Sequence, residues 1–135
     1  MVNPEQAGVA ALLLRLALGT MFLAHAWLKY KVFTPAGTAQ YFKSLGLPGE
    51  AAYLAIGAES LGGILLILGI ETRWVALALV PLMLGTIVLV HGKAGWLFTN
   101  KDGGWEYPAF WVVGLLALAL LGDGAAALGP MLGLP

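Results

Sequence analysis

The stretch AAYLAIGAESLGGILLILGI, residues 51–70, decides the class of this protein. It is apolar apart from Glu59 and Ser60, and a second apolar run, residues 7–28, contains Arg15 in the same way. Each run matches the roughly 20 residues that a helix needs to cross about 30 Å of hydrocarbon. A charge at that depth costs about 2.5–3.5 kcal/mol on insertion scales. We therefore expect Glu59 and Arg15 to be paired or functional.

The composition excludes a soluble globular protein. Of the 135 residues, 60% are hydrophobic and only 10% are charged, and the mean hydropathy is +0.88. Soluble domains carry about 25% charged residues. The net charge is zero and the basic residues are scattered, which gives no electrostatic footprint for nucleic acid. The absence of cysteine excludes thiolate metal sites and cysteine-ligated iron–sulfur clusters.

Four apolar segments predict four transmembrane helices, over residues 7–28, 51–70, 74–91 and 107–128. Each must be helical, because backbone polar groups cannot remain unpaired in lipid. The predicted fold class is all-α: a polytopic membrane four-helix bundle that forms one domain over residues 1–135. The first long loop predicts a short interfacial helix at 34–45, because Tyr41, Phe42 and Leu45 lie close to one face of it.

The distribution of basic residues predicts the orientation. The two long loops, 29–50 and 91–106, contain five lysines, whereas the opposite side has Arg73 alone. The positive-inside rule then places both loops in the cytoplasm and both termini outside. We expect a multi-pass protein of the inner (cytoplasmic) membrane.

Arg15 and Glu59 are predicted to form a structural ion pair. At 1.5 Å per residue, Arg15 lies about 11–12 Å and Glu59 about 16 Å from the side of the termini. The two spans are antiparallel neighbours, so an arginine side chain can bridge that difference, and pairing is the cheapest way to keep both charges in lipid. The pair either only locks the two spans in register or also lines a ligand cavity.

The four-span topology gathers the other polar residues at the loop side of the bundle. His25 and Lys29 lie near the end of the first span, His91 closes the third, and Glu106 opens the fourth. Candidates for a proton relay are His25, His91, Glu59 and Glu106. Candidates for binding a cofactor are Trp96, Trp105, Lys29 and Tyr107.

This set of residues predicts a pocket for a quinone head group. Aromatic walls suit the ring, and the histidines and carboxylates suit the protons that accompany the reduction of a quinone. Ligation of haem b by His25 and His91 is a weaker alternative, because nothing in the sequence orients the two rings toward one iron. No metal site is predicted, since no spacing matches a ligand motif. The alternative is a purely structural role, in which these residues only hold the bundle together.

A family resemblance is carried by LLLRLALGTMFLAHAWLK (12–29), by VFTPAGTAQYFKSLGLPG (32–49) and AESLGGILLILGIETR (58–73), and most specifically by HGKAGWLFTNKDGGWEYPAFW (91–111) with LGDG (121–124). The family that these stretches resemble is DoxX. One departure is Ala26, where many relatives have a glycine after the histidine. The resemblance implies a four-helix membrane protein. It also implies a link to quinone chemistry, since the related DoxD subunit is associated with thiosulfate:quinone oxidoreductase.

Three functions follow as hypotheses. The first is a membrane subunit of a quinone-linked redox system, such as an oxidoreductase of the thiosulfate:quinone type. In this hypothesis a partner subunit donates the electrons. The second is a non-catalytic anchor or assembly subunit, in a complex with another protein or as a homo-oligomer. The third is a small-solute transporter, which needs a polar path between the two faces of the lipid bilayer.

Overall fold

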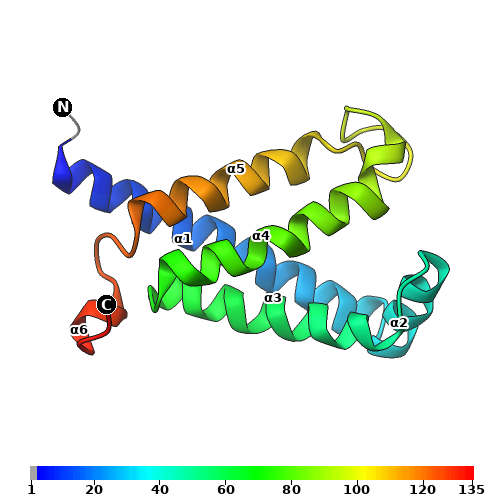
Figure 1. Cartoon of the computed structure of the whole chain (residues 1–135), viewed down its shortest axis with the longest axis horizontal. Coiled ribbons are helices and arrows are strands. Elements are labelled where there is room, and N and C mark those ends of the chain that lie inside the picture. Colours follow the sequence, from blue (N-terminus) through cyan, green and yellow to red (C-terminus); the bar gives the residue numbers. More distant parts are fainter. Residues whose placement is uncertain (1–2) are drawn as a thin grey trace.

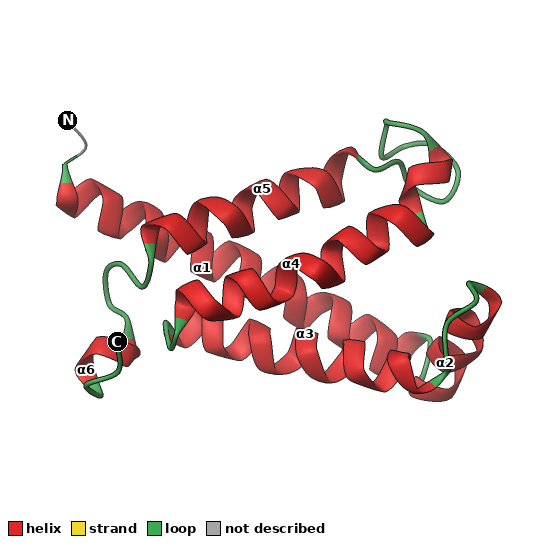
Figure 2. Cartoon of the chain, viewed as in Figure 1, coloured by secondary structure: helices red, strands yellow, loops and turns green. Residues whose placement is uncertain are grey.

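The computed structural model describes residues 3–135, which are mostly helical and contain no strand (Figures 1 and 2). Helix α1 covers Pro4–Trp27 and continues as a π-helical turn, η1, over Leu28–Val32. The other long helices are α3 at Glu50–Leu68, α4 at Thr72–Leu89 and α5 at Glu106–Leu121. Three short elements complete the fold: α2 at Pro35–Ser44, a 3-10 turn η2 at His91–Ala94, and α6 at Leu128–Met131.

The predicted all-α membrane bundle is confirmed. The helix Pro4–Val32, α3 and α4 are each long and apolar enough to cross a membrane, and α5 is a shorter apolar helix of 16 residues. The predicted end of the fourth span at residue 128 is wrong. Helix α5 stops at Leu121, because Gly122 has φ 79° and turns the chain out of the helix. Glycine adopts that conformation without the steric cost that a side chain would add.

Two antiparallel pairs of helices make the bundle, α1 with α3 and α4 with α5 (Figure 1). Contacts between α3 and α4 and between α1 and α5 join the pairs. Glycines set the closest approaches: a Cβ on Gly63 would lie 2.9 Å from the carbonyl oxygen of Gly19, and a Cβ on Gly62 would lie 2.9 Å from the side chain of Leu79. Small residues commonly allow membrane helices to approach this closely.

The short helix predicted in the first loop is present as α2. Pro35 stands in its first turn, and the Thr34 hydroxyl accepts a hydrogen bond from the amide of Gly37 at 3.1 Å. Both features are usual at the start of a helix. Helix α2 packs against α3 and η1, at the end of the bundle that carries the first loop (Figure 1).

Candidate functional site

A largely buried ion pair joins the end of the first long helix to the middle of α3. The ammonium of Lys29, in η1, donates to both carboxylate oxygens of Glu59 in α3, at 2.8 and 2.9 Å. The Thr38 hydroxyl in α2 lies 3.1 Å from the carbonyl oxygen of Lys29 and 2.8 Å from that of Thr34. Three elements, η1, α2 and α3, therefore meet at Lys29. The Glu59 carboxylate balances the charge of its ammonium.

The predicted pair of Arg15 with Glu59 is wrong. Arg15 is 1% exposed, and its guanidinium donates to the backbone carbonyls of Asp123 and Ala126. The cause is the register of α1 against α3: Gly19 faces Gly63, so Arg15 lies near the terminal end of α3. The Arg15 guanidinium lies beside Gly69, which is ten residues or about 15 Å along α3 from Glu59, and Glu59 pairs instead with the side chain of Lys29. Hydropathy had placed both charges inside their spans without fixing this register.

The segment after α5 closes the terminal end of the bundle. Besides accepting from Arg15, Asp123 accepts a hydrogen bond through Oδ1 from the amide of Thr72 at 3.0 Å, at the start of α4. That amide is one of those a helix leaves unpaired at its N-terminus. Further along, Ala125 donates to the carbonyl of Gly8 at 3.0 Å, and Gly129 donates to that of Gly69 at 2.9 Å. We call residues 122–129 the C-terminal clasp.

His25 is held against α5 rather than in an open pocket. Its Nδ1 lies 2.9 Å from the carbonyl oxygen of Met21, so Nδ1 carries the proton and Nε2 is an acceptor in the neutral ring. The imidazole meets the indole of Trp111 edge-on, with ring centroids 4.9 Å apart. Trp111 is 3% exposed, and its Nε1 has no hydrogen-bond partner within residues 3–135. Trp111 was not among the predicted site residues, although it follows Tyr107 by one helical turn.

His91 forms a hydrogen-bonded dyad with Tyr107. Its Nδ1 lies 2.8 Å from the carbonyl oxygen of Gly103, and its Nε2 lies 2.9 Å from the Tyr107 hydroxyl. A carbonyl oxygen can only accept, so Nδ1 carries the proton of the neutral ring and the tyrosine donates to Nε2. Both partners therefore have defined donor and acceptor roles.

The loop between η2 and α5 is closed by its own hydrogen bonds. The amide of Trp105 donates to the carbonyl of Gly95 at 2.9 Å, and that of Glu106 donates to the carbonyl of Trp96 at 3.1 Å. The Glu106 carboxylate accepts from the amide of Phe98 at 3.0 Å. The rings of Trp96 and Trp105 stack edge-to-face with centroids 4.5 Å apart. The loop thus presents its tryptophans in one fixed arrangement.

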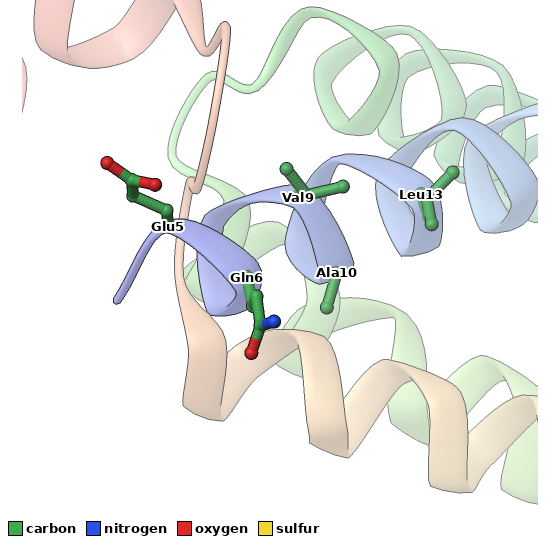
Figure 3. A pocket seen from close by; sticks show the side chains of 5 residues that line it. All are labelled: Glu5, Gln6, Val9, Ala10 and Leu13. Carbon is green, nitrogen blue, oxygen red and sulfur yellow. The ribbon is translucent and has the colours of Figure 1, made fainter. Parts of the chain in front are cut away.

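An open groove of about 500 Å³ runs beside this loop along the outer face of α5. Its lining residues are Trp96, Glu106, Tyr107, Ala109, Phe110 and Val113. A second depression, of about 390 Å³, lies on the outer face of α1 near its N-terminus, along Glu5, Gln6, Val9, Ala10 and Leu13 (Figure 3). The second depression includes none of the predicted site residues.

The predicted site residues thus form two groups. One group lies around α1 and α3 and contains His25, Lys29 and Glu59. The other group lies at the start of α5 and its preceding loop and contains His91, Trp96, Trp105, Glu106 and Tyr107. Trp111, one turn beyond Tyr107 on α5, is the residue that His25 contacts. The groove takes in members of the second group alone.

Comparison with known proteins identifies the family. The sequence model of the DoxX family matches residues 10–92. The chain belongs to the DoxX family. Among DoxX relatives, the chain is 33% identical to the protein named "Putative oxidoreductase CatD" of Bacillus subtilis (strain 168), over 90% of this chain and 86% of the relative. It is 35% identical to the inner membrane protein YphA of Escherichia coli (strain K12), over 89% of this chain and 88% of the relative.

A third relative is the inner membrane protein YqjF of Escherichia coli (strain K12), with 29% identity over 92% of both chains. No solved structure matches the chain significantly. The apolar helices and the two inner-membrane relatives support a multi-pass protein of the inner membrane. The orientation of the termini stays a prediction.

Proposed function

We propose that this DoxX protein is a membrane subunit of a quinone-linked redox system and that the groove on α5 holds the quinone head group. The observation that carries the proposal is the His91–Tyr107 dyad, whose tyrosine lines the groove. The Bacillus relative carries the name of an oxidoreductase, and this name supports a redox role for the present chain as part of the proposal.

The groove fits a head group in size and in chemistry. Its volume of about 500 Å³ is within the range of about 300–1,000 Å³ that is usual for small-molecule sites. Phe110 and Val113 are exposed on the outer face of α5, where lipid would surround a membrane helix. A lipid-soluble ligand could therefore enter sideways from the bilayer. Trp96 supplies an aromatic wall, and Trp105 supports that wall from behind.

A bound quinone would accept electrons together with protons. The residues of the chain can hold and orient those protons at defined atoms. Tyr107 is a polar residue on the groove wall, and its single hydroxyl proton goes to His91 Nε2, while the Gly103 carbonyl keeps His91 in one tautomer. When a further proton occupies His91 Nε2, that nitrogen donates to the tyrosine oxygen, and the Tyr107 O–H becomes free to donate to a quinone oxygen. Glu106 lies at the same end of the groove, with one carboxylate oxygen tied to the loop backbone. A tyrosine backed by a histidine and next to a carboxylate suits proton transfer.

Electrons would come from a separate donor subunit. The chain has no cysteine, so it cannot supply a cysteine-ligated cluster or a dithiol. The loop from Gly95 to Glu106 is the part of the second group that the chain fixes most firmly, and its apolar side chains Leu97 and Phe98 are exposed. That loop is the surface nearest to the groove on which a donor subunit could dock.

The test measures the binding of a short-tailed ubiquinone analogue to detergent-purified protein, with quenching of tryptophan fluorescence as the signal. Wild type should bind saturably. Tyr107→Phe removes a single hydroxyl, and the loss of one hydrogen bond of about 0.5–1.5 kcal/mol should weaken binding roughly 2- to 10-fold. Tyr53→Phe is the matched control, because Tyr53 is an exposed tyrosine of α3 outside the groove. Its affinity should equal that of wild type.

Two results would contradict the proposal. If folded wild-type protein shows no saturable quenching, the protein is an anchor whose polar residues only stabilise the bundle. If binding is saturable but Tyr107→Phe and Tyr53→Phe both match wild type, the head group binds elsewhere. Circular dichroism of each variant shows that the helices are intact.

A further inference from the structure

The π-helical turn at the end of α1 presents a lysine between two aromatic rings. The turn is closed by a hydrogen bond from the amide of Phe33 to the carbonyl of Leu28 at 3.0 Å. The ammonium of Lys31 lies 5.6 Å from the ring centroid of Trp27 and 5.9 Å from that of Tyr30. Isolated π turns are rare and are frequent at functional sites.

The charge of Lys31 is left without a carboxylate. Within residues 3–135 the single ion pair closer than 4.0 Å joins Lys29 to Glu59, so the neighbouring lysine is used inside the bundle and Lys31 is not. Trp27 is 61% exposed and Tyr30 is 55% exposed. Neither the indole N–H of Trp27 nor the hydroxyl of Tyr30 has a hydrogen-bond partner in the described part of the chain. One turn therefore displays one cation and two further free donors.

The position of this turn specifies the partner. Lys31 is the penultimate residue of the apolar helix Pro4–Val32, so it lies where a spanning helix leaves the hydrocarbon. Aromatic residues are enriched at that depth, and lysines there contact lipid head groups. The exposed side chains of Val32 and Phe33 continue beside it and offer apolar contact for acyl chains. A phosphodiester at this depth supplies acceptor oxygens for the three donors and a negative charge for the ammonium of Lys31.

We infer that Trp27, Tyr30 and Lys31 form a binding site for the head group of an anionic phospholipid. The ammonium contacts the phosphate, the indole and phenol groups donate to its oxygens, and the two rings limit the movement of the lysine. An anionic lipid is the occupant because a zwitterionic one carries its own cation next to the phosphate. The site is independent of the groove on α5 and of any quinone.

Native mass spectrometry of delipidated protein in detergent tests this inference. The probes are phosphatidylglycerol and phosphatidylcholine with identical acyl chains. Wild type should bind phosphatidylglycerol about five-fold more tightly, as expected for one lysine near a lipid surface. Lys31→Gln should abolish the preference and Lys31→Arg should restore it. Lys93→Gln, which alters an exposed lysine of η2, should keep the wild-type preference.

The inference is overturned if Lys31→Gln retains the preference of wild type, or if wild type binds the two lipids equally. It is also overturned if Lys93→Gln reduces the preference as much as Lys31→Gln, because the effect would then reflect total charge. A competition with glycerol phosphate separates a lipid site from a general phosphate site. Excess glycerol phosphate should not displace the lipid, since it lacks the chains that contact Val32 and Phe33.

Discussion

The ion pair between Lys29 and Glu59 can be tested by a double-mutant cycle. The glutamate side chain is 7% exposed and the lysine side chain is 20% exposed. Lys29→Met strands the more deeply buried charge, and removing one partner of a buried pair costs about 3–5 kcal/mol. Glu59→Leu strands an ammonium whose long stem can carry it toward the loop side, so a smaller loss of about 1–3 kcal/mol is expected. The double variant should be more stable than the sum of the two losses predicts.

The free energy of unfolding is measured by reversible denaturation in mixed micelles, with tryptophan fluorescence as the signal. A coupling energy of about 2 kcal/mol or more between Lys29 and Glu59 is expected, since contacting residues couple by about 0.5–3 kcal/mol. The control is a second cycle with Arg15→Leu and Glu59→Leu. Those two sites are about 15 Å apart along the bundle, so their losses should add to within about 0.5 kcal/mol. Additive losses at Lys29 with coupling at Arg15 would refute the register described above.

Three further outcomes are expected from the helix packing, the C-terminal clasp and the distribution of lysines. Gly63→Ala places a methyl group 2.9 Å from the carbonyl oxygen of Gly19 and should cost about 1–3 kcal/mol in unfolding free energy, whereas Gly57→Ala, where nothing lies within 4 Å, should be neutral or slightly stabilising. Asp123→Ala removes the acceptor of the Thr72 amide and should lower stability by about 1 kcal/mol in the same assay, with the exposed Asp102→Asn unchanged, because asparagine tolerates the φ of 69° at that position. Single cysteines at positions 43 and 101 should resist a membrane-impermeant thiol reagent added from outside and a cysteine at position 71 should react; the reverse pattern contradicts the predicted orientation.

The sequence was sufficient to predict the helices and the class of protein. Uninterrupted apolar runs have one solution in lipid, because every backbone amide and carbonyl must find a partner inside its own segment. The short helix of the first loop could also be predicted, since Tyr41, Phe42 and Leu45 fall on one face of it, and the structure adds Thr34 and Pro35 as its start. The end of α5 is set by the backbone conformation of Gly122. Glycines are common inside apolar runs, so Gly122 alone did not show where the helix ends.

The register between helices could not be predicted from hydropathy. An apolar helix can slide along its neighbour with little change in transfer free energy, so the depth of Arg15 and Glu59 inside their own spans does not fix their relative height. Contacts such as Gly19 against Gly63 fix it, and those depend on both surfaces together. The π turn of η1, which contains Lys29, was also not predicted, although Lys29 pairs with Glu59 from it.

The candidate site was predicted in part for a related reason. His91, Glu106 and Tyr107 lie at the two ends of the loop 91–106, which joins two neighbouring antiparallel helices, so their proximity followed from the topology. The placement of His25 depended on the packing of α1 against α5, and its aromatic neighbour, Trp111, was missed. Trp111 lies in the most family-specific stretch of the sequence and one turn from Tyr107, which is the signal that could have revealed it.

The distribution of polar groups along the bundle bears on the transporter hypothesis. The C-terminal clasp and Arg15 occupy the terminal end, the histidines and Lys29 lie toward the loop side, and Glu59 lies halfway along α3. Between these levels the core is apolar, with Leu18, Phe22, Leu66, Leu115 and Leu118 all buried. A charged or hydrated solute crossing that layer would lose its hydration without gaining partners, at a cost of several kcal/mol. A path within the described residues would require these side chains to separate. A ligand that enters from the loop side or from the lipid, as proposed for the groove, needs no such opening.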